Sequence, residues 1–142
     1  MSMEISREEK EQLIEQAAAA GKMAYAPYSG YLVGAALLTE SGRIYTGCNV
    51  ENASFGVANC AERTAFFKAV SEGEREFKAI AIVGKGVDAG TSFPEFAYPC
   101  GICRQVMLEF CREDFTVLVA RDSADFREYA LRELMPFGFG GK

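Results

Sequence analysis

The first half of the chain opens with a helical hydrophobic pattern. Apolar residues within 13–18 recur at the three- and four-residue spacing that places side chains on one helix face. Ser6 followed by Glu9 has the form of a capping box, which starts a helix. Because proline disfavours helical geometry in the residue before it, the helix is predicted to run to about Tyr25 and to stop at Pro27.

The remaining pattern alternates strands with helices. Strands are predicted at 31–39, 43–50, 77–83 and 115–120, and helices at 60–72 and 100–111. Segment 125–134 fits either a short strand plus a helical turn or one helix. Residues 84–98 form a long loop, which is either functional or mobile. This order predicts one α/β domain over residues 1–142, built on a mixed sheet.

Composition narrows the chemistry. With 49% hydrophobic residues in 142, the chain can bury a core of its own. It contains no histidine, which excludes Ser-His-Asp triads, Cys-His proteases, HExxH zinc peptidases and C2H2 zinc fingers. Any proton carrier must therefore be a carboxylate, lysine, tyrosine or cysteine, and any soft-metal site must be built on thiolates.

Charge and cysteine usage indicate where the chain acts. The net charge of −5 argues against nucleic acid as a partner, because binding to a phosphate backbone needs a positively charged surface. No run approaches the roughly 20 apolar residues that span a bilayer, so no membrane partner is expected. The first residues show no apolar secretory segment, and the five cysteines are an odd number. We therefore expect a cytoplasmic protein with free thiols.

Three cysteines carry the strongest chemical signal. Cys100 and Cys103 are three apart and share a helix face, while Cys60 stands at the start of the other predicted helix. Helix N-termini favour thiolates, and three thiolates on Zn²⁺ leave a fourth position for water. Glu62 can face the same centre only if Cys60 occupies the cap or first turn. A carboxylate there can carry protons between water and substrate.

Other interpretations of these residues stay open. Arg63 and Arg104 are next to the centre, where they either offset the thiolate charge or are solvated helix residues. Cys48 or Cys111 could supply a fourth ligand, although both fit buried structural positions. Cys-Gly-x-Cys at a helix start is also typical of a thioredoxin-like dithiol redox protein. A purely structural zinc module would lack a ligand.

Five stretches, in order along nearly the whole chain, make the sequence resemble the small, homotetrameric, three-cysteine type of cytidine deaminase. They are Ala26–Ser29, Val33–Leu38, Gly47–Asn52, Cys60–Ala65 and Pro99–Gln105, with a weaker match at Glu133–Pro136. The resemblance implies an α/β/α three-layer sandwich with one zinc ion per chain. It implies hydrolytic deamination of cytidine and deoxycytidine to uridine and deoxyuridine, with release of ammonia, in pyrimidine salvage.

The resemblance also implies a role for individual residues. Cys60, Cys100 and Cys103 match the zinc ligands, and Glu62 matches the group that protonates N3 of the cytosine ring and then the departing amine. The substrate contacts implied are the Asn49 and Glu51 pair on the ribose 3′-hydroxyl, the Ala61 backbone, Tyr31 and Phe139. Arg63 and Gln105 match residues behind the ligands, with Arg63 neutralising a thiolate.

Three departures from the family pattern concern the substrate. Tyr31 stands where the family usually has phenylalanine, and Phe55 where it often has tyrosine. The loop before Pro99 is longer and more aromatic than usual, so it could cover the pocket or line a subunit contact.

Two alternatives to these assignments remain. Phe137 competes with Phe139 as the tail aromatic that reaches a neighbouring subunit's site. The runner-up substrate is a modified or antibiotic cytosine nucleoside of the blasticidin type.

Overall fold

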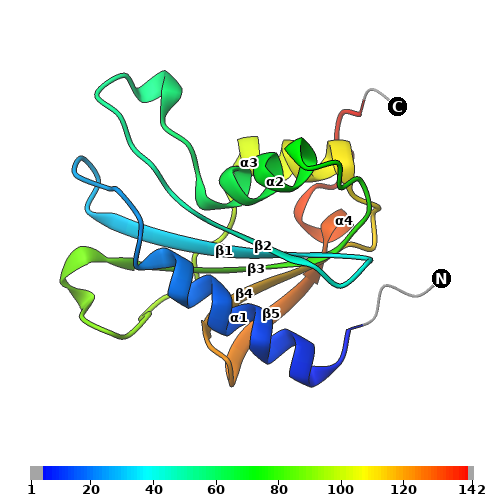
Figure 1. Ribbon diagram of the computed structural model, residues 1–142, viewed down its shortest axis with the longest axis horizontal. Helices are drawn as coiled ribbons and strands as arrows, with labels where there is room; N and C mark the ends of the chain where they lie inside the picture. The colour runs from blue at the N-terminus through cyan, green and yellow to red at the C-terminus, as the bar shows by residue number, and fades with distance from the viewer. Residues whose placement is uncertain (1–4, 141–142) are drawn as a thin grey trace.

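The computed structural model of the chain describes residues 5–140 as five strands, four α-helices and two short 3-10 helices (Figure 1). In chain order these elements are α1 (Arg7–Gly21), β1 (Tyr31–Thr39), β2 (Ile44–Cys48), η1 (Phe55–Val57), α2 (Ala61–Ser71), β3 (Phe77–Gly86), η2 (Val87–Ala89), α3 (Gly101–Phe110), β4 (Thr116–Asp122), β5 (Asp125–Ala130) and α4 (Leu131–Leu134). No helix in this range is long and apolar enough to cross a membrane.

The strands form one mixed sheet in the order β2-β1-β3-β4-β5. β1 pairs antiparallel with both β2 and β3, β3 pairs parallel with β4 through the α3 crossover, and β5 is antiparallel to β4. Figure 1 shows α1 on one face of the sheet and α2 and α3 on the other. The predicted α/β/α sandwich is confirmed.

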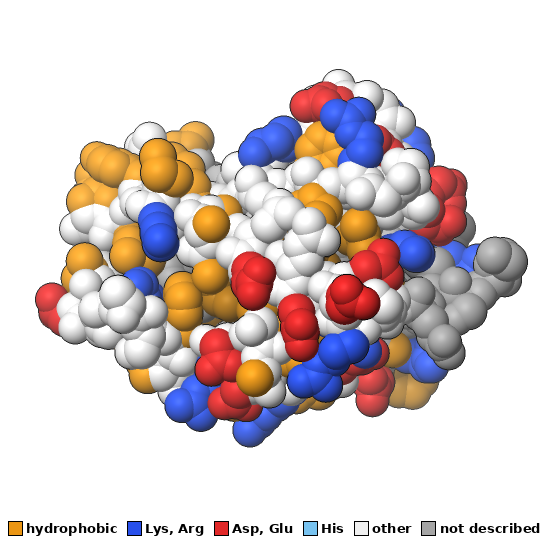
Figure 2. All heavy atoms as spheres, turned by 60° about the horizontal axis from the view of Figure 1, so that its bottom comes forward, with side chains coloured by type: hydrophobic (Ala, Val, Ile, Leu, Met, Phe, Trp, Pro, Cys, Tyr) orange, Lys and Arg blue, Asp and Glu red, His pale blue; other side chains and the backbone are white. Residues whose placement is uncertain are grey.

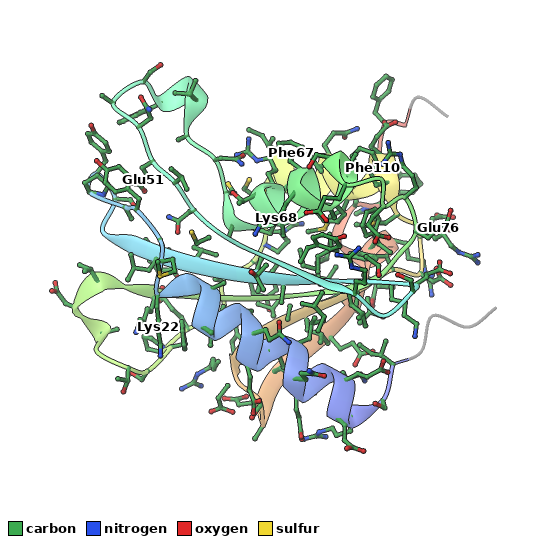
Figure 3. The ribbon with its side chains drawn as sticks, in the orientation of Figure 1. Lys22, Glu51, Phe67, Lys68, Glu76 and Phe110 are labelled. Atoms are coloured by element: carbon green, nitrogen blue, oxygen red, sulfur yellow. The ribbon has the colours of Figure 1, made fainter. Side chains whose placement is uncertain are left out.

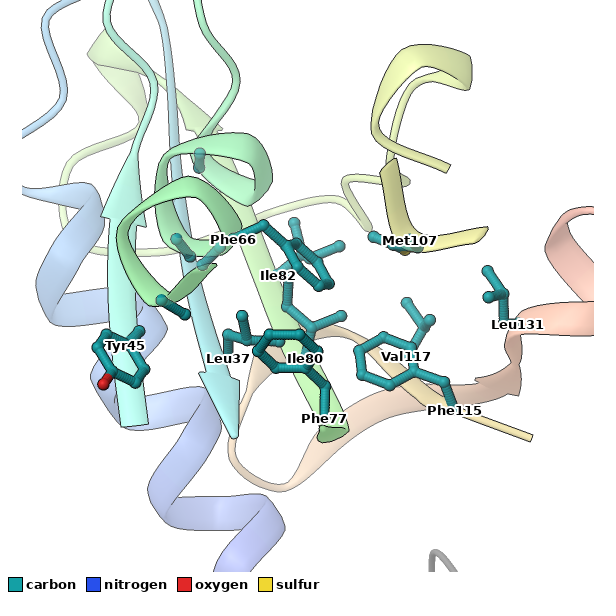
Figure 4. Packing of buried hydrophobic residues seen from close by; sticks show 14 of the residues in the cluster. Leu37, Tyr45, Phe66, Phe77, Ile80, Ile82, Met107, Phe115, Val117 and Leu131 are labelled. Atoms are coloured by element: carbon teal, nitrogen blue, oxygen red, sulfur yellow. The ribbon is translucent and has the colours of Figure 1, made fainter. Parts of the chain in front are cut away.

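Each face of the sheet has its own hydrophobic core. Along β1, Ala35 and Leu37 belong to the cluster under α2 and α3, and Ala36 and Leu38 belong to the cluster under α1. This alternation is the two-residue period of a strand buried on both faces. Aromatic residues fill the first cluster, where Phe66 meets Phe77 with ring centroids 5.2 Å apart (Figure 4).

The sheet face that packs against α1 carries smaller buried residues than the other face, and the surface of the molecule on this side is polar. Alanines of β1, β3 and β4 lie beneath α1, so the helix packs close to the sheet. A Cβ on Gly34 would lie 1.9 Å from the carbonyl oxygen of Ala17, so only glycine fits there. The outer surface on this side carries acidic and basic side chains intermixed (Figure 2).

The structure differs from the sequence-based boundaries in a few places. The α1 helix ends at Gly21 rather than near Tyr25, because Tyr25 pairs with the segment after β2: its N–H donates to Asn49 and its carbonyl accepts from Glu51. The hairpin strand β2 ends at Cys48, and β3 extends to Gly86 along β1. Segment 125–134 is a strand plus a helical turn, the first of the two predicted forms.

The first turn of α2 rests directly on β2. A Cβ added to Gly47 would lie 2.5 Å from the Ala61 carbonyl oxygen and 2.6 Å from the Ala65 amide nitrogen. Real Cβ atoms essentially never come this close to other atoms, so glycine is required for the contact. This contact sets where α2 begins relative to the sheet, and therefore where Cys60 and Glu62 lie.

Candidate functional site

Two helix N-termini bring three cysteine sulfurs together. Cys60 is the N-cap of α2 and Cys100 is the N-cap of α3, both with extended backbone, and Cys103 lies one turn into α3. The Sγ atoms of Cys60 and Cys100 are 3.7 Å apart, and those of Cys100 and Cys103 are 3.6 Å apart. All three sulfurs lie within 4.8 Å of one another. The condition on Glu62, that Cys60 caps its helix, is met.

The cluster has the dimensions of a thiolate zinc site. Four ligands at about 2.3 Å around tetrahedral Zn²⁺ place neighbouring sulfurs about 3.8 Å apart. The two distances above are close to that spacing, and the positive ends of α2 and α3 meet at the cluster. In residues 5–140, no further metal-ligand atom joins the three, so neither Cys48 nor Cys111 is a fourth ligand. A zinc ion held by these three sulfurs would keep a fourth position for water, as in catalytic zinc sites.

The guanidinium of Arg63 stabilises the thiolate form of Cys60. Its Nη2 donates to the Cys60 sulfur at 3.1 Å. Hydrogen bonding from Cys103 and then from Arg63 lowers the pKa of Cys60 to about 5. The hydrogen bond to Cys60, followed by burial, raises the pKa of Cys103. The buried Nε of Arg63 has no partner among the described residues, so it is free to donate to a further acceptor at the site.

Glu62 is a carboxyl group buried beside the thiolates. Its side chain is 4% exposed, although it belongs to the first turn of α2. Loss of water around it is the main reason that its pKa rises to about 7, and the nearby Cys60 thiolate adds to the rise. A carboxyl group with a pKa near neutral pH can both accept and release a proton, which is what general acid–base catalysis needs.

These groups line a pocket of about 530 Å³. Nine of the residues singled out in the sequence lie in its wall: Tyr31, Asn49, Glu51, Phe55, Cys60, Ala61, Glu62, Arg63 and Cys100. Cys103 lies behind the wall and is 1% exposed. A volume of this order accommodates a small organic molecule.

Asn49 and Glu51 are held in fixed orientations at the mouth of the pocket. The Asn49 side chain accepts from the Val33 N–H and donates to the Tyr31 carbonyl, both at 2.8 Å. Glu51 accepts from the Ser29 hydroxyl and from the N–H groups of Tyr28 and Ser29, at 2.9 and 3.0 Å for the latter two. The Ser29 hydrogen bonds lower the pKa of Glu51. Figure 3 shows Glu51 on the loop after β2, at the end of the molecule where β1 begins.

The loop before Pro99, expected from its sequence either to cover the pocket or to line a subunit contact, forms part of the pocket wall. Its last residues, Ala97 and Tyr98, line the pocket. Ala97 sits over β3, where a Cβ on Gly84 would lie 2.8 Å from the Ala97 Cβ. The same added atom would lie 2.9 Å from the Tyr31 ring, so Gly84 lets Tyr31 and Ala97 approach closely. No spacing rule ties a loop residue such as Tyr98 to a metal site, so the sequence carries no signal for it.

Two predicted site residues, Gln105 and Phe139, do not line the pocket. Gln105 donates to the carbonyl of Phe139 at 2.7 Å, so it ties α3 to the C-terminal segment. Phe139 is 81% exposed and is absent from the wall of its own chain's pocket. Arg104 donates to the carbonyls of Pro99 and Leu134 at 2.9 and 2.8 Å, and the thiolate contact belongs to Arg63.

Comparison with known proteins decides the family. Residues 7–119 match the model of the cytidine and deoxycytidylate deaminase zinc-binding region. The chain belongs to this family. Zinc is therefore its cofactor, in agreement with the three-sulfur cluster. The dithiol redox alternative fails, because it uses neither the third sulfur nor the adjacent buried carboxyl group.

Deaminase relatives cover almost the whole chain. A cytidine deaminase of Sporosarcina psychrophila is 49% identical over 91% of this chain and 90% of its own. A probable cytidine deaminase of Dictyostelium discoideum is 42% identical over 93% and 84%. The crystal structure of cytidine deaminase from Burkholderia pseudomallei, 47% identical, superposes with a TM-score of 0.81 over 90% of this chain and 97% of that one.

Proposed function

We propose that this chain, as a single domain over residues 1–142, catalyses the hydrolytic deamination of cytidine and deoxycytidine to uridine and deoxyuridine, with release of ammonia. The observation that carries the proposal is a buried carboxyl group, Glu62, in the wall of the same pocket as two of three clustered cysteine sulfurs. The relatives named above as cytidine deaminases support the substrate. The reaction would serve pyrimidine salvage in the cytoplasm, where five unpaired cysteines stay reduced.

Each reacting proton has a carrier in this pocket. Cys60, Cys100 and Cys103 would hold the zinc ion. When bound, zinc supplies a Lewis acid that lowers the pKa of a water molecule towards neutrality. Glu62 accepts a proton as the water oxygen bonds to C4 of the cytosine ring, and donates it to N3. Glu62 then carries the second water proton to the amino group, which leaves as ammonia when the C4–N bond breaks.

The other pocket residues would hold the nucleoside. Asn49 and Glu51 would bind the ribose 3′-hydroxyl, because each retains hydrogen-bonding capacity beyond its contacts within the chain. The N–H of Ala61, in the first turn of α2, has no intrahelical partner and would hold the base. The Tyr31 ring would form a side wall, and Arg63 would balance the thiolate charge.

We propose further that the chain acts as a homotetramer in which neighbouring subunits complete the sites. Phe139 is exposed and does not line its own chain's pocket, and Gln105 hydrogen-bonds to its carbonyl. Phe137, two residues earlier, is fully exposed. The surface at the pocket mouth also carries the exposed aromatic residues Tyr28 and Phe55. Apolar side chains gathered in this way are typical of interfaces between proteins.

Ultraviolet absorbance during incubation of the zinc-loaded chain with cytidine and with deoxycytidine tests the proposed reaction. We expect both to be converted, with one ammonia released per nucleoside, and we expect Glu62→Gln to retain zinc without converting either. Conversion of blasticidin S alone would overturn the proposed substrate in favour of the antibiotic nucleoside. Full activity of the Glu62→Gln variant would overturn the role of Glu62.

A further inference from the structure

The segment that leads into Cys100 lacks the backbone hydrogen bonds that normally hold a pocket wall. Within residues 5–140, no backbone–backbone hydrogen bond involves residues 92–98. Two of these residues, Ala97 and Tyr98, line the pocket, and Pro99 joins them directly to Cys100. The position of this wall therefore depends on side-chain contacts.

One side chain on the outer strand of the sheet makes two of these contacts. The guanidinium carbon of Arg127, on β5, lies 4.1 Å from the centroid of the Phe96 ring. Nη1 of Arg127 also donates to the Tyr98 hydroxyl at 3.0 Å. The Tyr98 hydroxyl shares a second hydrogen bond with the hydroxyl of Tyr129, at 2.8 Å. Arg127 thus holds the residues on both sides of Ala97.

The geometry points to Arg127 as a positioning residue, which acts through Tyr98 and Phe96 to fix the pocket wall and the entry to Cys100. This inference rests on the proposed function for its substrate. Nothing in the sequence motifs around the cysteines includes β5, and Arg127 is absent from the pocket wall itself. Its effect on the reaction must therefore pass through the two aromatic residues that it contacts.

The contacts predict which kinetic parameter changes. Arg127 contacts Tyr98, which lines the pocket, and Phe96, which lies next to the lining residue Ala97 in the chain. It makes no hydrogen bond or ion pair with Glu62 or the sulfurs. A looser wall weakens substrate binding in the ground state and the transition state alike, which raises KM and leaves kcat nearly unchanged. Because the wall continues into Cys100, bound zinc should also leave more easily.

The test compares Arg127→Met with Arg127→Lys and with the matched control Arg121→Met. Methionine keeps an apolar stem beside Phe96 but can neither donate a hydrogen bond nor carry charge. Lysine keeps a cation and a donor, so it should restore most of the wild-type behaviour. The guanidinium carbon of Arg121 lies 5.7 Å from the centroid of the same ring, but Arg121 pairs with Asp125 and has no contact with Tyr98.

Two measurements are made on each variant: steady-state kinetics with cytidine, and the rate of zinc transfer to a colorimetric chelator. Arg127→Met should raise KM by roughly three- to tenfold, the size expected for coupling between contacting residues, and should speed zinc transfer by a similar factor. Arg121→Met should match the wild-type protein in both. Equal values for Arg127→Met and wild type, or equal changes in both arginine variants, would overturn the inference.

A double-mutant cycle separates positioning from general destabilisation. If Arg127 acts through Tyr98, then Tyr98→Phe should reproduce much of the change, and adding Arg127→Met to it should produce little more. Fully additive changes in KM would contradict the inference. If Arg127→Met does not fold, Tyr98→Phe alone decides, and wild-type KM and zinc-transfer rate in that variant would contradict the inference. If the wild-type chain does not convert cytidine, the proposed function fails, and the zinc-transfer rates still decide the role of Arg127.

Discussion

Gly47 offers a direct test of how the fold positions the reacting groups. The residue lies on β2 beneath the first turn of α2, and substitution by alanine adds one carbon atom there. That atom would lie 2.5 Å from the carbonyl oxygen of Ala61 and 2.6 Å from the amide nitrogen of Ala65. In an α-helix these two atoms are partners in the first-turn hydrogen bond. The clash is therefore with backbone, which cannot rotate away as a side chain can.

The size of the required movement follows from these distances. Ordinary contacts of a Cβ begin at 3.4 Å, so the start of α2 must move by 3.4 − 2.5 = 0.9 Å or strain must remain. Overpacking of this kind costs about 1–3 kcal/mol of unfolding free energy. Misplacement of catalytic groups by about 1 Å can cost roughly a hundredfold in rate. Because Cys60 and Glu62 belong to this turn, we expect activity to fall much more than stability.

The assay measures kcat/KM for cytidine, bound zinc and chemical unfolding for Gly47→Ala, with Gly86→Ala as control. Gly86 is also a strand glycine, but a Cβ there meets nothing within 4 Å. We expect Gly47→Ala to lose about a hundredfold in kcat/KM, whereas the control stays near wild type. A Gly47→Ala variant with wild-type kcat/KM and unchanged unfolding free energy would refute the view that this contact places the site.

Three other substitutions test single residues. Glu62→Gln should keep the fold and zinc but lower kcat by roughly 10²–10⁴-fold, because an amide cannot carry the proton; metal analysis and initial rates check this. Cys103→Ala should lose zinc and lower the unfolding temperature, since metal binding is coupled to folding, and full zinc occupancy would show that the ligand set is wrong. Glu51→Gln should raise KM for cytidine by roughly tenfold through loss of a charged hydrogen-bond acceptor. It should change KM little for 3′-deoxycytidine, and an equal increase for both nucleosides would contradict the ribose contact.

Local sequence signals predicted the elements that carry the metal ligands. The capping box of Ser6 and Glu9 forms as expected, and the cysteines at 60 and 100 cap the helices predicted from periodicity. Spacing alone could also anticipate that Glu62 joins the sulfurs only at a helix start. These features depend on residues close in sequence, so a pattern can reveal them.

The parts of the site that the sequence did not reveal depend on contacts between distant segments. Tyr98 joins the pocket wall through Tyr129 and Arg127, about 30 residues away along the chain. Which of two arginines meets a thiolate also depends on tertiary packing: Arg104 lies next to Cys103 in sequence but donates to Leu134. Propensity and spacing carry no information about such pairs.

The central claim is that the three cysteines and Glu62 form one zinc-dependent deamination centre. The most direct test is to strip the protein of zinc, return the ion in measured steps, and determine bound zinc and uridine formation on the same samples. We expect activity to rise in proportion to bound zinc and to level off at one ion per chain. Uridine formation by the zinc-free chain, or a fully loaded chain that forms none, would contradict it.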